Sequence, residues 1–315
     1  MKFLKNLKKI FVRPVVLTVG NFDGLHLGHR AIISRVVAEA KKTGSDSLVL
    51  TFQPHPQQVL GEKGPVKFLN SLAEKIWLFE GTGLNYLVQL PFTEKLSRWS
   101  AEKFFIYLSK FFKIKKLVAG FDFALGAGKS AGLLELEGIG YSLGFEVRPV
   151  PAEKYKNRVI SSSLIRRLLR MGKLERAVAK LGGFYPIFGR VVRGRGLGRR
   201  LGFPTANLTI SADKLLPSSG VYLAVVEIGG HWYRALVNIA REKAGSVVEV
   251  FLLDFSGNLY NRRLKVLLVK MLRPEKKFKK NIALSRQIER DVKRAKKFFK
   301  RFSLGCCDSG GRPKN

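Results

Sequence analysis

The chain has 315 residues, 46% of them hydrophobic, and its 58 lysines and arginines outweigh 23 acidic residues to give a formal net charge of +35. This length fits one large or two ordinary domains with real hydrophobic cores, and no apolar run is long enough to span a bilayer, which argues against a membrane protein. A surface this basic attracts polyanions, namely nucleotides, nucleic acids or anionic lipids.

The two ends of the chain carry few functional signals. Residues 1–13 are basic and amphipathic but lack the apolar stretch and cleavage site of a signal peptide, so we predict a short surface helix and a cytoplasmic protein. The adjacent Cys306 and Cys307 lie in a tail, 304–315, that we predict to be disordered. Adjacent cysteines rarely pair with each other, so they predict neither a disulfide framework nor a metal site.

Between residues 14 and 182, apolar runs typical of buried strands alternate with stretches of helical periodicity. The predicted strands are Val15–Phe22, Ser47–Phe52, Tyr86–Phe92, Lys116–Phe123 and Phe145–Val150. The predicted helices lie near Arg30–Thr43, Ser71–Gly81, Ala101–Phe112 and Leu133–Leu143. This α/β alternation predicts a parallel sheet covered by helices, in which ligands bind at the carboxyl ends of the strands.

The segment 18–29 joins the first predicted strand to the first predicted helix and contains the sequence G-N-F-D-G-L-H-L-G-H. A helix N-terminus attracts phosphate through unpaired N–H groups and the helix dipole, and Gly28 between His26 and His29 lets a ligand come close. We therefore predict a nucleotide phosphate site. The residues expected beside it are Gly20, Asn21, Phe22 and Asp23. Two alternatives stay open: a turn in which these residues only set the geometry, and a zinc site, for which no cysteine lies nearby.

Three further motifs follow in the same region. T-F-Q-P-H-P at 51–56 follows the second strand, and His55 is either a ligand of the pocket or the cap of a turn. The loop G-F-D-F-A-L-G-A-G at 120–128 contains Asp122. In I-S-S-S-L-I-R at 160–166, hydroxyls precede a predicted helix, and they suit both an N-cap and a phosphate, since a helix start serves both roles at once.

From about residue 183, short strands rich in valine and leucine are separated by turn signals such as Gly229-Gly230 and Ser256-Gly257-Asn258. The predicted strands are Gly189–Val192, Val221–Ile228, Trp232–Ile239, Val247–Phe255 and Leu264–Leu272. They indicate a small antiparallel β-barrel. A closing basic helix is expected from Asn281 to Phe302. Its expected apolar face consists of Ile282, Ile288, Val292, Ala295 and Phe299.

The barrel region holds a second glycine-rich motif, G-R-G-L-G-R-R-L-G-F-P-T-A-N-L at 194–208. Its glycines alone resemble a dinucleotide loop, but we expect Pro204 and a polar turn to follow instead of a helix. Glycines beside arginines suit a loop that wraps a phosphate, and Thr205 and Asn207 offer the hard oxygen ligands that Mg²⁺ prefers. A flexible basic hairpin is the alternative. Glu249 lies inside an apolar strand, as a candidate general base or as an outward-facing residue.

In this order, the motifs resemble those of the bacterial bifunctional riboflavin kinase/FAD synthetase family over about residues 15–300. The resemblance implies a Rossmann-like nucleotidyltransferase domain at 14–182, which joins FMN to the AMP part of ATP and releases pyrophosphate. It implies a riboflavin kinase barrel with a C-terminal helix at 183–303, which phosphorylates riboflavin with ATP to give FMN. The substrates would be ATP, riboflavin and FMN, and the metal would be Mg²⁺.

The resemblance also implies residue roles, which fall into two sets. In the first domain, His26 and His29 would be catalytic. The β- and γ-phosphates would be held by Ser162, Ser163 and Arg166, and the flavin by His55 and Asp122. In the barrel, Glu249 would take the proton of the riboflavin hydroxyl. ATP and Mg²⁺ would contact Gly194, Gly196, Gly198, Thr205 and Asn207, and L-R-P-E-K-K-F would bring Arg273 to the flavin.

The chain departs from the family pattern at two places. Leu125 replaces an aromatic residue, and Asn238-Ile239-Ala240 runs into 241–245 without the proline and threonine of the family's N-I-G…P-T-F. One alternative is thus an FMN adenylyltransferase with a degenerate kinase barrel. Residues 276–301 hold 12 lysines and arginines against two acids. They form a solvated helix face or make nonspecific nucleic-acid contacts, so a second alternative is a nucleic-acid-binding protein on an inactive scaffold. The sequence does not indicate an oligomeric state.

Overall fold

The computed structural model describes residues 1–8, 12–61, 67–155, 158–194, 196–242 and 245–301. The chain forms two compact units. The first comprises Met1–Lys67 and Lys75–Ser161, and the second comprises Phe68–Glu74 and Ser162–Asn315. The predicted boundary at 182/183 concerns catalytic domains rather than compact units and stays a prediction. The predicted tail, with Cys306 and Cys307, lies outside the described residues.

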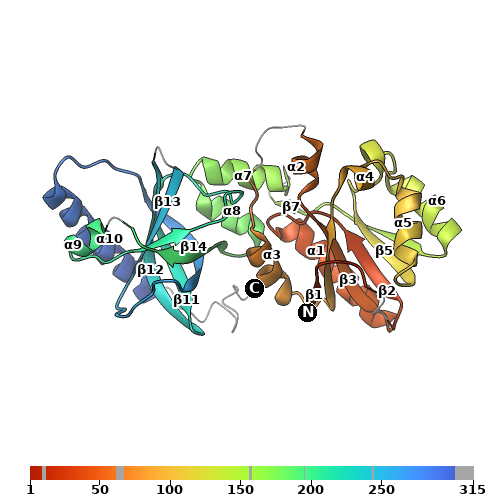
Figure 1. Cartoon of the computed structure of the whole chain (residues 1–315), viewed down its shortest axis with the longest axis horizontal. Coiled ribbons are helices and arrows are strands. Elements are labelled where there is room, and N and C mark those ends of the chain that lie inside the picture. Colours follow the sequence, from red (N-terminus) through yellow and green to blue (C-terminus); the bar gives the residue numbers. More distant parts are fainter. Residues whose placement is uncertain (9–11, 62–66, 156–157, 195, 243–244, 302–315) are drawn as a thin grey trace. The chain divides into compact units, whose positions relative to one another are not determined.

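The first unit is built on a six-stranded parallel sheet with the strand order β1-β4-β3-β2-β5-β6 (Figure 1). The strands are β1 (Lys2–Leu4), β2 (Val15–Val19), β3 (Asp46–Gln53), β4 (Tyr86–Pro91), β5 (Ile114–Gly120) and β6 (Glu146–Val150). Every residue of β2 is buried, as expected for a central strand covered on both faces. The predicted Rossmann-like class is confirmed.

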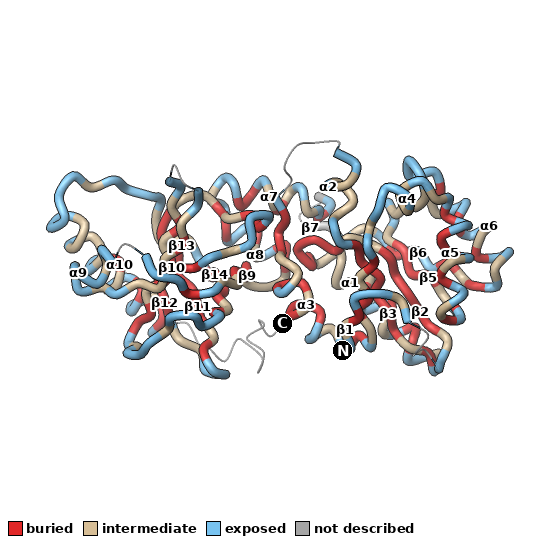
Figure 2. The backbone as a smooth tube through the Cα atoms, viewed as in Figure 1, coloured by how far each residue is buried: buried red, intermediate tan, exposed pale blue. Residues whose placement is uncertain are grey.

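Helices cover both faces of this sheet, and buried residues concentrate in its central strands (Figure 2). The helical elements are α1 (Leu27–Lys42), α2 (Pro56–Leu60), α3 (Leu72–Glu80), α4 (Glu94–Ser97), α5 (Ala101–Ser109), a 3₁₀ turn (Ala127–Lys129) and α6 (Leu133–Leu143). On one face, Leu17 and Leu50 share a hydrophobic cluster with Phe104 and Phe105 of α5. Helix α1 lies across β2, β3 and β5 on the other face (Figure 1). A short pair, β7 (Lys154–Tyr155) and β8 (Arg158–Val159), follows the sheet.

The N-terminal helix predicted for residues 1–13 is wrong. Residues 2–4 form the edge strand β1, which pairs in parallel with β4, and the amide of Lys2 donates to the carbonyl of Asn85 at 2.8 Å. Leu4 is 7% exposed because it completes the core beside β4. Because this segment is a strand, burial of its side chains follows the two-residue alternation of a strand and not the periodicity of a helix.

The second unit contains a closed antiparallel barrel, of which Figure 1 labels β11, β12, β13 and β14. Its strand order is β10-β13-β12-β11-β14-β9, which confirms the predicted barrel. The strands are β9 (Tyr185–Val192), β10 (Ala206–Thr209), β11 (Gly220–Ile228), β12 (His231–Glu242), β13 (Gly245–Leu252) and β14 (Arg263–Pro274). The helices are α7 (Ser162–Arg170), α8 (Leu174–Leu181), the single turn α9 (Leu197–Arg200) and α10 (Asn281–Arg301). Neither β10 nor α9 was predicted from the sequence, which indicated a polar turn there instead.

Buried ion pairs hold the peripheral segments of the second unit. Lys214 and Glu74, whose side chains are both 0% exposed, pair at 2.8 Å, and Glu74 also accepts the amide of Phe188 at 2.8 Å. On α10, Asp291 is buried and accepts from Arg273 of β14 at 2.8 Å. These partners explain why the segment 68–74 and α10 are both fixed to the barrel.

The apolar face predicted for α10 is correct toward its C-terminal end and wrong at its start. Ala295 and Phe299 are buried, whereas Ile282 is 61% exposed. The ion pair between Arg273 and Asp291 holds the Asp291 side of the helix against β14. In the part of the chain that the structure describes, no helix is both long enough and apolar enough to cross a membrane.

Candidate functional site

The loop between β2 and α1 places two histidines at a helix N-terminus. His26 is the N-cap of α1, and its Nδ1 accepts the backbone amide of His29 at 3.3 Å. Because Nδ1 accepts, a neutral His26 carries its proton on Nε2, which remains a donor. The two imidazole rings stack with their centroids 3.6 Å apart and an interplanar angle of 18°. The structure thus brings together the two histidines that the sequence predicted to act together.

Both histidines are neutral at pH 7. Burial lowers the pKa of His26 from 6.5 to about 4, and the charge of Asp23 only partly offsets this. The pKa of His29 lies well below 6.5 because of burial, the neighbouring His26 and the charge of Lys75. His29 as a whole is half-buried, but its Nδ1 atom is fully enclosed. These residues can donate hydrogen bonds to an anion but bring no charge to it.

The turn before the histidines is held in an uncommon conformation. Phe22 and Leu25 have φ values of 47° and 40°, a region that non-glycine residues rarely occupy. The Phe22 ring packs edge-on against His29 at 5.2 Å and against Phe79 at 6.0 Å. This conformation also ends β2 at Val19 instead of at the predicted Phe22.

Two enclosed polar atoms of this loop have no hydrogen-bond partner among the residues that the structure describes: Nδ1 of His29 and Oδ1 of Asn21. Native proteins satisfy nearly all of their buried polar atoms, so two unpaired atoms in one turn distinguish this loop from the ordinary core. Asp23 is 4% exposed and lies in the same turn. The glycine at position 20 lies under the ring of Phe22, since a Cβ there would be 3.1 Å from it.

Lys75 of α3 also reaches this loop, although the sequence analysis did not select it. Its Nζ donates to the carbonyl of Asn21 at 2.8 Å and to Oγ1 of Thr51 at 3.4 Å. In the sequence, Lys75 stands beside Glu74 in an otherwise apolar stretch, a pattern that also suits a solvent-exposed ion pair. The sequence does not distinguish a buried lysine that contacts the loop from a lysine in a solvent-exposed ion pair.

Two residues predicted to contact flavin lie after strands of the same sheet. His55 follows β3 and is the N-cap of α2, where its Nδ1 accepts the amide of Gln57 at 3.2 Å. Asp122 is exposed and lies two residues beyond the end of β5. The capping alternative for His55 is therefore present in the structure, while the flavin contacts of both residues stay predictions.

The serine-rich motif lies in the second unit. Ser162 and Ser163 form the start of α7, and Arg166 follows in the next turn, next to the buried Ile165. The histidines at positions 26 and 29 belong to the first unit. The triphosphate clamp that the sequence analysis built from both motifs is thus divided between the two units and stays a prediction.

The barrel aligns three polar residues across neighbouring strands. Asn207 of β10 is opposite Glu249 of β13, and Glu249 is opposite Asn238 of β12. Nδ2 of Asn238 donates to Oε2 of Glu249 at 3.1 Å. Glu249 is half-buried between the buried Val248 and Val250. Strand alternation therefore places these polar side chains on the face opposite the barrel core.

The glycine-rich loop packs directly against the predicted oxygen ligands. A Cβ on Gly194 would lie 2.1 Å from Nδ2 of Asn207, and a Cβ on Gly198 would lie 3.0 Å from Oγ1 of Thr205. Gly196 has a φ of 70° and precedes α9. Phe203 of the loop contacts Phe251, two residues beyond Glu249, with ring centroids 5.7 Å apart. The loop is thereby held over the face that carries Glu249.

Two other predictions for the barrel have a structural setting. The Nε of Arg273 is engaged by Asp291, which gives the arginine a role in anchoring α10, and its predicted flavin contact stays a prediction. The segment after Asn238, where the chain departs from the family pattern, continues β12, and Arg241 pairs with Ser246 of β13. The described part of the departure therefore lies in the last residues of β12, beyond Asn238, and the pairing of Asn238 with Glu249 is intact.

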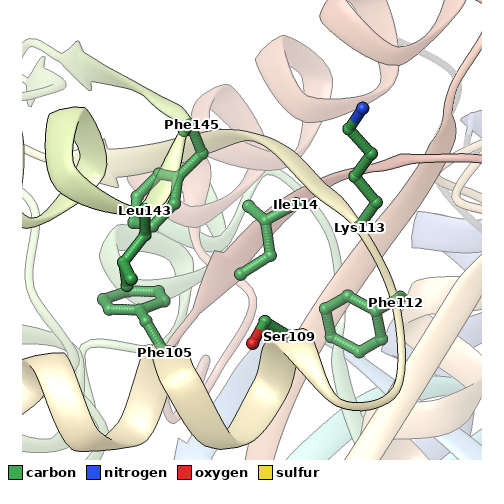
Figure 3. A pocket seen from close by; sticks show the side chains of 8 residues that line it. Phe105, Ser109, Phe112, Lys113, Ile114, Leu143 and Phe145 are labelled. Carbon is green, nitrogen blue, oxygen red and sulfur yellow. The ribbon is translucent and has the colours of Figure 1, made fainter.

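A surface pocket of the first unit lies at the opposite end of the sheet from the histidines. Figure 3 shows the rings of Phe105, Phe112 and Phe145 around it, near the start of β5 and β6. Its polar side chains are Ser109 and Lys113. Parallel sheets bind ligands at the carboxyl ends of their strands, so this pocket is not the candidate site. Across the described ranges, no three histidine, cysteine or acidic side chains gather as metal ligands.

Comparisons with known proteins find two families that match successive parts of this chain. Residues 8–164 match the family described as FAD synthetase, and residues 181–299 match the family described as riboflavin kinase. The chain is 35% identical over 309 residues to a bifunctional riboflavin kinase/FMN adenylyltransferase of Buchnera aphidicola, covering 94% of this chain and 97% of that protein. It is 33% identical over 311 residues to the protein of the same description from Escherichia coli, covering 95% and 98%. A crystal structure described as a macrolide-efflux protein from Streptococcus pneumoniae matches with a TM-score of 0.84 and 29% identity, covering 94% and 98%.

Proposed function

This chain belongs to the family of bifunctional riboflavin kinase/FMN adenylyltransferases, and we propose that its two reactions depend on two separate groups of catalytic residues, the histidine loop of the first unit and Glu249 of the second. The chain phosphorylates riboflavin with ATP to give FMN, and it joins FMN to the AMP part of ATP to give FAD and pyrophosphate. The observation that carries the assignment is that the stacked histidines and Glu249 belong to different units.

We assign adenylyl transfer to the loop between β2 and α1. A phosphate oxygen of FMN attacks the α-phosphorus of ATP, the bond to the β-phosphate breaks, and pyrophosphate leaves. The nucleophile is already an anion, so the barrier lies in the charge on the transferred and leaving phosphates. Nε2 of His26 and the N-terminus of α1 donate hydrogen bonds to that charge, together with His29. The contacts of Ser162, Ser163 and Arg166 with the β- and γ-phosphates stay a prediction from the sequence.

We assign riboflavin phosphorylation to Glu249. Its carboxylate takes the proton of the terminal ribityl hydroxyl, the hydroxyl oxygen attacks the γ-phosphorus of ATP, and ADP leaves. The amide of Asn238 occupies Oε2, which orients the carboxylate and leaves Oε1 for the proton. Asn238 is thus a positioning residue that the sequence analysis noted only as the start of an altered segment.

The residues around the glycine-rich loop fit Mg²⁺. The Thr205 hydroxyl and the Asn207 amide oxygen are hard ligands, and Gly194 and Gly198 allow the loop to pack directly against these two residues. When bound, Mg²⁺ would neutralise charge on the phosphates of ATP. The contacts of His55, Asp122 and Arg273 with flavin are part of the same proposal. Nonspecific nucleic-acid contact by α10 and a cytoplasmic location stay predictions from the sequence.

A pair of substitutions tests the assignment, and each serves as the control for the other. His29→Ala should abolish FAD formation from supplied FMN while riboflavin phosphorylation persists. Glu249→Gln should stop riboflavin phosphorylation while FMN is still converted to FAD. Normal FAD output from His29→Ala, or normal FMN output from Glu249→Gln, would overturn the corresponding half of the proposal.

A further inference from the structure

We propose that Lys75 is a positioning residue of the adenylyl-transfer site, where its ammonium group fixes the turn at Asn21 and places a buried positive charge beside the two histidines. This inference rests on the proposed function, because it takes the loop between β2 and α1 as the site of adenylyl transfer. Neither the motifs of the sequence nor the comparisons point to Lys75.

The contacts of Lys75 join three elements that are distant in sequence. From α3, its Nζ donates to the carbonyl of Asn21 at 2.8 Å, across a separation of 54 residues. It also donates to Oγ1 of Thr51 near the end of β3 at 3.4 Å, and that hydroxyl donates to the same carbonyl at 3.4 Å. The ammonium therefore ties the phosphate loop to two other elements of the first unit.

Packing alone does not explain a lysine at this position. Lys75 is 8% exposed, and burying an ammonium group is unfavourable unless its charge is used. An apolar side chain of similar length would fill the same space, and such replacements of buried charges are often neutral or stabilising. Instead, the buried charge donates a hydrogen bond to the backbone of the loop that carries the two histidines and acts electrostatically on His29, which points to a role in that loop.

Electrostatics gives that charge a role in the reaction. His26 and His29 are neutral at pH 7, so they donate hydrogen bonds without countering the negative charge that develops on the phosphates. Below about pH 8, Lys75 supplies a positive charge close to His29, and preorganised charge in a water-poor site is an effective form of catalysis. The lysine also explains part of the lowered pKa of His29, since its charge opposes a second positive charge there.

The charge of Lys75 has a predicted pH dependence. Burial lowers the pKa of Lys75 from 10.5 to about 8, and the carboxylate of Asp23 partly offsets this shift. The titratable groups that interact with it electrostatically are Asp23 and His29, while its partner on β3 is the uncharged Thr51. Adenylyl transfer should therefore decline as the pH rises through about 8, because the ammonium loses its proton.

The test uses the full chain with two substitutions at Lys75 and one matched control. Lys75→Met removes the charge and keeps the length of the side chain, whereas Lys75→Arg keeps a charge that does not titrate in this range. Lys116→Met removes another partly buried lysine of the first unit, which pairs with Glu39 at 2.8 Å and with Glu146 at 3.0 Å. The measurements are kcat and KM for FMN adenylylation from pH 6 to 10 (a range set by the pKa of about 8), together with riboflavin phosphorylation by the same preparations.

We expect Lys75→Met to lower kcat for adenylylation by about 10- to 100-fold, the range for losing a charged hydrogen-bonding group, with riboflavin phosphorylation unchanged. Lys75→Arg should retain more activity and lose the alkaline decline, and Lys116→Met should keep the wild-type rate and profile. If Lys75→Met does not fold, the profile of Lys75→Arg decides. Unchanged adenylylation in Lys75→Met, an equal loss in Lys116→Met, or a wild-type alkaline decline in Lys75→Arg would overturn the inference. Full activity of His29→Ala would instead overturn the proposed function.

Discussion

The substitution Gly194→Ala tests the geometry of the kinase loop. A Cβ at this position would lie 2.1 Å from Nδ2, 2.4 Å from Cγ and 2.8 Å from Oδ1 of Asn207. Favourable contacts between carbon atoms lie at about 3.5–4.0 Å, so the amide must move by more than about 1 Å. Because Asn207 is half-buried, its side chain can rotate outward, and the fold should survive. A displacement of about 1 Å at a reacting site lowers the rate by about 100-fold.

The assay follows FMN formation from riboflavin and ATP, with FAD formation from supplied FMN as the internal control. We expect kcat/KM for riboflavin phosphorylation to fall by about 100-fold while FMN adenylylation is unchanged. Gly138→Ala is the matched control, because no atom lies within 4 Å of its Cβ position and the residue is in α6. That change should stabilise the chain by about 0.5–1 kcal/mol and affect neither reaction. Normal riboflavin phosphorylation by Gly194→Ala would refute the role of Asn207.

Three further predictions concern the barrel and the histidine loop. Asn238→Leu removes the hydrogen-bond donor to Glu249, so kcat for riboflavin phosphorylation should fall by about 10-fold while adenylylation is unchanged. An unchanged kcat for riboflavin phosphorylation would show that Asn238 does not position Glu249. Lys214→Met leaves the Glu74 carboxylate buried without a countercharge and should lower the free energy of unfolding by about 3–5 kcal/mol in urea denaturation, whereas adding Glu74→Gln should restore part of it. The pKa of His26 is about 4 in the folded chain and 6.5 as its ordinary value, so the unfolded chain binds the proton first as the pH falls. Its contribution to stability is full above pH 6.5 and is lost toward pH 4, by about 2 kcal/mol between pH 6.5 and 5. If the free energy of unfolding depends on pH in the same way in His26→Gln as in the wild type, the pH dependence does not come from His26.

The sequence predicted the features that depend on neighbouring residues. The loop G-N-F-D-G-L-H-L-G-H places its histidines three residues apart at the start of a helix, and the structure shows His26 as the cap with its ring stacked on that of His29. The alternation of strand and helix, followed by short valine-rich strands, was enough to predict both fold classes. Periodicity of apolar residues determines local structure and the buried face together.

The features that were missed depend on residues brought together from far apart. Lys75 reaches a carbonyl 54 residues away, and the contact between Asn238 and Glu249 exists only because β12 and β13 pair in one register. Asp291 of α10 is buried because it pairs with Arg273 of β14, and the periodicity of apolar residues in the helix does not reveal that contact. The wrong helix at the N-terminus has the same cause, because the strand Lys2–Leu4 is stabilised by pairing with β4.

A mixing experiment tests most directly the claim that the two reactions occur at two independent sites. His29→Ala and Glu249→Gln are each incubated with riboflavin, ATP and Mg²⁺, alone and as an equimolar mixture, and FMN and FAD are resolved by chromatography. The account predicts that His29→Ala alone accumulates FMN, that Glu249→Gln alone forms neither product, and that the mixture forms FAD because FMN from one chain reaches the intact adenylyl-transfer site of the other. FAD from either variant alone, or no FAD from the mixture, would contradict it.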